Sequence, residues 1–119
     1  MRLVLATVGV SFLPLLASAH HAFSANYDVN EKGSIEGVVE EIFWANPHVH
    51  FYVRVTNQDG SNELWDAEDS NLTGMSRRGW NRNTISVGDK IRISGSMGRD
   101  GRRRIWAAEV FWADGSPVR

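Results

Sequence analysis

The stretch from Ile42 to Val55 constrains the fold more than any other part of this sequence. After Asn46-Pro47, apolar and polar residues alternate, as they do in a strand that is buried on one side only. His48 and His50 fall on the polar side, about 7 Å apart along a strand, so both could reach one small ligand or ion. Pro47 disfavours helix at Asn46, which predicts a corner between two strands. The apolar side, which would face a core, consists of Val49, Phe51, Val53 and Val55.

Similar patterns predict the other elements of the chain. Apolar residues change phase near Gly37 in the first strand, which indicates a bulge or bend. A short helix is predicted within 69–80, where Asp69 or Ser70 can provide the N-cap. The last strand would place Trp106, Ala108, Val110 and Trp112 on one side. The predicted strands are 34–44, 48–56, 63–68, 90–96 and 104–112.

Three strands, a short helix and two further strands follow one another in the order of a five-stranded OB barrel. The sequence therefore predicts an all-β fold with one short helix and an OB-like barrel over residues 34–115. Closure of the barrel is favoured because short strands must hide their edges. A small open β-sandwich is the alternative architecture.

The first 19 residues have the layout of a secretory signal peptide. Met1-Arg2 is positively charged, residues 3–16 are almost entirely apolar, and Ala17-Ser18-Ala19 is an A-x-A cleavage site. The apolar run is too short for a membrane anchor, and no second apolar span follows it. We therefore expect a mature chain in the periplasm or secreted, in which residues 20–33 form an N-terminal arm with a loop over 28–33.

Composition argues against several classes of function. The formal net charge is −1, so the chain has no general attraction to nucleic acid. It contains no cysteine, which excludes disulfides and thiol nucleophiles. Glu40 and Glu41 would point to opposite faces of a strand, which does not suit an acid–base pair. No catalytic residue is predicted, and the sequence is not expected to encode an enzyme.

The four histidines suggest a metal site. Cleavage after Ala19 would make His20 the first residue, and it would then offer its α-amine and its ring Nδ1 to one metal ion. A second imidazole from His21, His48 or His50 would complete a set of nitrogen ligands that suits Cu(II), with zinc as the competitor. Binding requires deprotonated imidazole and amine, so the metal affinity should fall as the pH falls.

The alternative function is a binding module without a metal. OB barrels often bind ligands on the face of strands two and three. A basic and aromatic patch of Arg77, Arg78 and Trp80 could hold a sugar, a peptide or a protein partner. Trp44 and Asn46, at the predicted corner, are the other candidate ligand-binding residues. The usual burial of these residue types favours another interpretation, in which Trp80 is a core residue and the two arginines form a solvated surface.

Several motifs together resemble one known family. They are His20-His21-Ala22-Phe23, Trp44-Ala45-Asn46-Pro47-His48, Arg78-Gly79-Trp80 and Val87-Gly88-Asp89-Lys90-Ile91. They are similar to motifs of an uncharacterised family of small exported bacterial proteins that is defined only as a domain of unknown function. The resemblance implies export and a compact domain, and it implies no activity.

Overall fold

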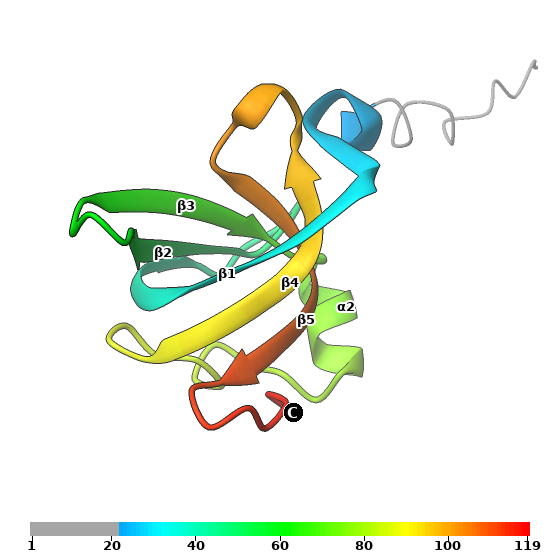
Figure 1. The fold of residues 1–119 in the computed structure, drawn as a ribbon. Coiled ribbons are helices and arrows are strands. Elements are labelled where there is room, and N and C mark those ends of the chain that lie inside the picture. Colours follow the sequence, from blue (N-terminus) through cyan, green and yellow to red (C-terminus); the bar gives the residue numbers. More distant parts are fainter. Residues whose placement is uncertain (1–21) are drawn as a thin grey trace, which may run out of the picture.

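The computed structural model describes residues 22–119, which form a mostly β structure with short helices (Figure 1). Residues 22–26 are helical and lead directly into the first strand. A 3-10 turn, Arg99–Gly101, joins the last two strands. The strands and the main helix are β1 (Tyr27–Phe43), β2 (His50–Thr56), β3 (Asn62–Glu68), α2 (Leu72–Arg77), β4 (Lys90–Gly98) and β5 (Arg104–Trp112).

The five strands close into a ring in the order β1-β2-β3-β5-β4, and β4 pairs back with β1. Four of the five pairings are antiparallel, and the β3–β5 pairing is parallel. The predicted all-β fold is therefore confirmed, and the strands form a ring and not the open sandwich considered as the alternative. Ring closure leaves each of these strands with a neighbour on both sides, which protects its edges.

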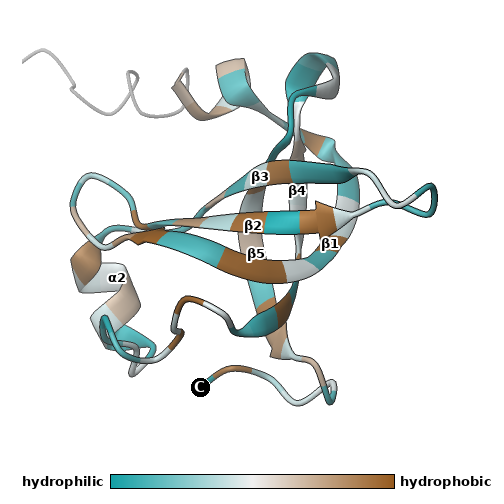
Figure 2. Cartoon of the chain, turned by 90° about the vertical axis from the view of Figure 1, so that its left-hand side faces the viewer, coloured by the Kyte–Doolittle hydropathy of each residue, from teal (hydrophilic) through white to brown (hydrophobic). Residues whose placement is uncertain are grey.

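The strand β2 has the predicted orientation. Val49, Phe51 and Val53 are at most 1% exposed, whereas His48 and His50 are only partly buried. Apolar and polar residues can be followed along β2 and β5 in Figure 2. The residues that complete the core come from every strand, from α2 and from the segments around it, and include Ile35, Val39, Ala67, Met75, Trp80, Ile85, Ile91, Ile93, Ile105 and Val110.

The bend predicted in the first strand is present. The pairing of β1 with β2 is irregular between Val39 and Glu41, just after Gly37. A Cβ on Gly37 would lie 2.2 Å from the backbone oxygen of Arg54, so only glycine allows the two strands to approach so closely here. The irregularity also leaves both Glu40 and Glu41 exposed, whereas regular alternation predicts opposite faces.

The first strand begins earlier than predicted. Residues 28–33, predicted as a loop, belong to β1, and Lys32 and Gly33 pair with Ser96 and Gly95 of β4. Backbone pairing at Tyr27, Lys32 and Gly33 holds this segment at both ends. Its side chains are mostly exposed, so it lacks the apolar pattern that identifies a strand. The folded unit also extends beyond the predicted end at residue 115, because Val118 is buried in the core.

The predicted face of the last strand is wrong. In the β4–β5 pairing, Ser94 pairs with Glu109, whereas the next residue, Gly95, pairs with Ala107. Ala108 is therefore an extra residue in β5. Alternation breaks at that residue. As a result Val110 faces the core with Ile105 and Ala107, while Trp106 lies on the outer side.

The helix α2 is present but begins later than predicted. Its N-cap is Asn71, whose side chain accepts a hydrogen bond from Gly74 N at 2.8 Å, and not Asp69 or Ser70. Asp69 is buried and pairs with Arg78. Within residues 22–119, no helix has the length and apolar character needed to cross a membrane.

Candidate functional site

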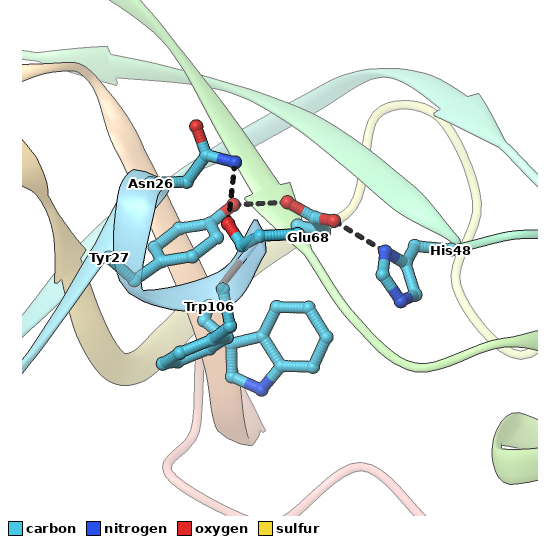
Figure 3. A pocket seen from close by; sticks show the side chains of 7 residues that line it. Asn26, Tyr27, His48, Glu68 and Trp106 are labelled. Carbon is cyan, nitrogen blue, oxygen red and sulfur yellow. Dashed lines mark hydrogen bonds and ion pairs between the residues drawn. The ribbon is translucent and has the colours of Figure 1, made fainter. Parts of the chain in front are cut away.

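A pocket of about 430 Å³ opens where the N-terminal helix meets the ends of three strands. We call it the aromatic pocket (Figure 3). Its walls come from the helix, the first residue of β1, the corner before β2, the end of β3, and β5. It therefore brings together residues that are far apart in the sequence. The lining residues are Ala22, Phe23, Asn26, Tyr27, His48, Glu68 and Trp106.

Glu68 is the centre of the polar network in this pocket. Glu68 is only 8% exposed, and three side chains converge on its carboxylate. His48 Nδ1 lies 2.6 Å from Oε1, while Arg104 Nη2 donates to Oε2 at 2.9 Å and the Tyr27 hydroxyl also donates to Oε2. Burial, followed by the hydrogen bond to Glu68, raises the pKa of Tyr27. The buried carboxylate is thus fully paired, which is how a protein accommodates such a charge.

The two ring nitrogens of His48 have different environments: Nδ1 contacts Glu68, and Nε2 does not. In a neutral ring, the Glu68 carboxylate beside Nδ1 favours the tautomer that carries its hydrogen on Nδ1. Figure 3 shows Nε2 directed away from Glu68. The side chain is 39% exposed, and Nε2 has no hydrogen-bond partner in the described part of the chain. Its lone pair is therefore available to a ligand.

A second histidine–carboxylate pair lies beside the first. His50 Nδ1 is 2.6 Å from Asp66 Oδ1, and the ring stacks on Tyr52. Arg104 connects the two pairs, because its Nε lies 3.3 Å from Asp66 Oδ2 while its Nη2 binds Glu68. The Nε–Asp66 contact is an ion pair whose alignment does not make a hydrogen bond. His50 does not line the aromatic pocket.

The N-terminal segment is held against the ring. The Arg99 guanidinium donates to the backbone oxygen of Ser24, and Arg104 approaches the Asn26 side chain at 3.4 Å. Figure 1 shows this helix beside the loop between β4 and β5. The predicted ligands His20 and His21 lie outside the described residues. Ala22, the next residue in the chain, lines the aromatic pocket.

The other predicted ligand-binding residues lie elsewhere. Trp44 packs against the core, and the Asn46 side chain accepts a hydrogen bond from Leu72 N at 2.9 Å. Arg77 is exposed at the end of α2. Trp80 is buried and contacts Phe51, while the Arg78 guanidinium lies 4.8 Å from the Trp80 ring centre.

Arg78 and Trp80 do line a second pocket, of about 230 Å³, together with β5 and the C-terminal residues. Trp44, Asn46 and Arg77 line neither of these two pockets. Within the predicted patch, Arg78 and Trp80 therefore share a pocket, and Arg77 does not belong to it.

Sequence reasoning missed the partners that organise the aromatic pocket. Asp66 and Glu68 are two residues apart in β3, and His48 and His50 are two residues apart around the start of β2. This matching spacing of two acids and two histidines was the signal in the sequence that could have identified the pairs. Arg104 was not among the predicted site residues, but it connects the two pairs. Among the side chains of residues 22–119, no three of His, Cys, Asp or Glu are grouped so that they could hold a metal ion.

Comparison with known proteins places the chain in a family without assigning an activity. No curated protein matches the sequence. A family model, described as a family of unknown function, matches residues 9–106, which is most of the chain and includes every strand up to the first part of β5. This protein therefore belongs to the family of unknown function DUF6152.

Proposed function

We propose that this chain is a small exported protein that binds a transition metal ion, with Cu(II) as the expected metal and zinc as its competitor. Residues 1–19 are removed on export to the periplasm or the medium, which leaves His20 as the first residue. The metal is held by the α-amine and the ring of His20, and by the imidazole of His48. His21 is a further candidate ligand.

The observation that carries this proposal is that Ala22 and His48 line the same pocket. Consecutive Cα atoms are 3.8 Å apart, so the Cα of His20 can be no more than about 8 Å from that of Ala22. We therefore propose that a terminal histidine reaches the Nε2 of His48. A site with several protein ligands would need His20 or His21, because residues 22–119 alone supply no group of three.

The environment of His48 supports the same assignment. Histidines that bind metals commonly donate their other ring N–H to a carboxylate, which fixes the ring and raises its basicity. His48 has this arrangement with Glu68. His50 has it with Asp66, but His50 lies outside the pocket that Ala22 lines. His48 is therefore the preferred ligand, and His50 offers a matched control.

We further propose that the ring of strands is an OB-like barrel. Its strand order, its parallel β3–β5 pairing and the helix between β3 and β4 support this assignment. A fold of this kind hosts many functions, so the metal proposal depends on the histidines and not on the barrel.

The test uses protein exported from a bacterial host with its own leader. Intact mass and N-terminal sequencing should give a chain that begins at His20. That chain should bind about one Cu(II) near neutral pH, with nitrogen hyperfine structure in the electron paramagnetic resonance spectrum. Added copper should raise the melting temperature by mass action, and binding should weaken as the pH falls because the ligands become protonated.

Two variants and one control make the assignment specific. One extra residue before His20 converts the amine to an amide and should weaken binding strongly. His48→Ala should also weaken binding, whereas His50→Ala should change it little. A mature chain that begins elsewhere, or equal weak binding by the native and extended chains without stabilisation, would show that the histidines are not a metal site.

The second candidate function is a metal-free binding module for a sugar, peptide or protein partner. The observation that favours it is the second pocket, which Arg78, Trp80 and Arg119 line together. If copper does not bind, Arg78→Ala is the first variant with which to test partner binding at this surface.

A further inference from the structure

Three aromatic rings line the aromatic pocket and pack against one another. The ring centres of Phe23 and Trp106 lie 5.3 Å apart in an edge-to-face contact, and Tyr27 lies 5.3 Å from Phe23 and 5.8 Å from Trp106. His48 also meets Trp106 edge to face at 5.2 Å. A volume of about 430 Å³ is within the range of pockets that hold small molecules. Such walls favour a flat ring, which can pack against them by stacking or edge contacts.

The charges at this pocket are already paired with one another. Glu68 accepts from His48, Tyr27 and Arg104, and Arg104 also faces Asp66. The described residues that line the pocket therefore leave no charge without a partner. A charged ligand would lose its hydration and find no counter-charge, which is costly. This pairing favours a neutral ligand.

His48 offers a polar atom to a ligand in this pocket. His48 Nε2 points away from Glu68 and has no partner in residues 22–119, and the ring is held in place by the Glu68 carboxylate at Nδ1 (Figure 3). With the hydrogen of the neutral ring at Nδ1, Nε2 accepts a hydrogen bond. A ligand that carries an O–H or N–H group would satisfy it.

From these three features we propose that the aromatic pocket binds a neutral, planar molecule with one hydrogen-bond donor, of the phenol or indole class. Its ring packs against Phe23 and Trp106, which both line the pocket, and its donor binds His48 Nε2. Phe23 belongs to the N-terminal helix, so that segment forms one wall of the site. This proposal does not depend on metal binding, because the walls and the acceptor all lie in residues 22–119.

The first experiment measures ligand binding by the full chain at pH 8 after metal has been removed with a chelator. Phenol and indole are titrated by nuclear magnetic resonance or calorimetry, with benzoate, benzylamine and toluene as comparison probes. Phenol or indole should bind with a Kd of about 1 mM or lower. Benzoate and benzylamine should bind at least about tenfold more weakly because the pocket offers no free counter-charge. Benzoate binding as tight as that of phenol, or no binding of phenol and indole, would overturn the proposal.

The second experiment locates the ligand. Phe23→Ala and Trp106→Ala should each weaken phenol binding at least about tenfold, since the ring loses a wall. Phe111→Ala is the matched control, because Phe111 lines the other pocket, and it should leave phenol binding unchanged. Circular dichroism and thermal melts would confirm that each variant is folded. Unchanged phenol binding by folded Phe23→Ala and Trp106→Ala would contradict the assignment.

Two further variants separate this site from the proposed metal site. His48→Ala should weaken phenol binding while leaving toluene binding unchanged, since toluene has no donor for Nε2. The chain with one extra residue before His20, which should lose copper, should still bind phenol. Loss of phenol binding in that extended chain would show that the pocket needs the free N-terminus, and the proposal in this form would be wrong.

Discussion

Glu68 shows how a single residue can organise a site that its neighbours in the sequence do not reveal. It is the last residue of β3 and is nearly buried, so its carboxylate must find partners. The partners come from Tyr27, His48 and Arg104, which lie on three different elements. Burial of the carboxylate is thus possible only when β1, the corner before β2, and β5 meet at this point. The same network fixes the His48 ring and anchors the start of β1.

The raised pKa of Tyr27 gives a prediction at this scale. Burial and the Glu68 carboxylate keep the Tyr27 phenol protonated in the folded state, whereas an unfolded tyrosine ionises near pH 10. Above that pH the folded state therefore binds more protons than the unfolded state. The free energy of unfolding should fall by about 1.4 kcal/mol per pH unit as a result.

Urea unfolding of the native protein and of Tyr27→Phe between pH 9 and 11 would measure this effect. The variant will be less stable at neutral pH, because Glu68 loses a donor, but its stability should decline less steeply above pH 10. The pKa of Tyr52 is also raised, mainly by burial and then by Asp66, and it contributes equally to both proteins. Parallel stability curves would mean that Tyr27 does not carry the pH dependence.

Among the elements, β2 is the most predictable from sequence. Its alternation is unbroken, and the structure places Val49, Phe51 and Val53 inside. Phe51 is 1% exposed and contacts Trp80, so Phe51→Ala should reduce the free energy of unfolding by about 3–5 kcal/mol. His50→Ala is the neighbouring control and should cost about 1 kcal/mol or less, since Asp66 keeps its contact with Arg104. Denaturant unfolding would measure both changes. A neutral Phe51→Ala with a strongly destabilised His50→Ala would place the strand in the opposite register.

The two strands that sequence analysis predicted incorrectly, β1 and β5, share one physical cause. The first residues of β1 are fixed by backbone pairing with β4, and β5 is shifted at Ala108 by an extra residue relative to β4. Both features depend on a partner strand that is distant in sequence, so neither changes the local apolar pattern. The histidines and the first-strand bend could be identified from that pattern. The aromatic pocket could not, because Trp106 faces it only as a consequence of the pairing shift.

At the scale of the whole molecule, the β3–β5 pairing closes the ring and also supports the site. Three residues of β3, from Asp66 to Glu68, pair with Arg104 to Trp106, whereas β1 and β4 pair over a longer stretch from Lys32 to Val38. Parallel pairing is also slightly less stable per residue than antiparallel pairing. Side chains cross this short junction, because Arg104 of β5 binds both Asp66 and Glu68 of β3. The polar network of the candidate site therefore helps to hold the ring closed.

The β3–β5 junction should therefore be the first part of the ring to open when Arg104 is replaced. Arg104→Met keeps an apolar side chain of similar reach but leaves two carboxylates without their shared cation. Native-state hydrogen exchange should then show a loss of protection at the paired amides of 66–68 and 104–106 that exceeds the loss in the β1–β4 pairing. Arg92→Met on β4 is the matched control, because the Arg92 guanidinium packs over Phe111 and is exposed, away from both carboxylates. An equal loss of protection around the whole ring in Arg104→Met would mean that the strands open as one cooperative unit and that the junction has no separate weakness.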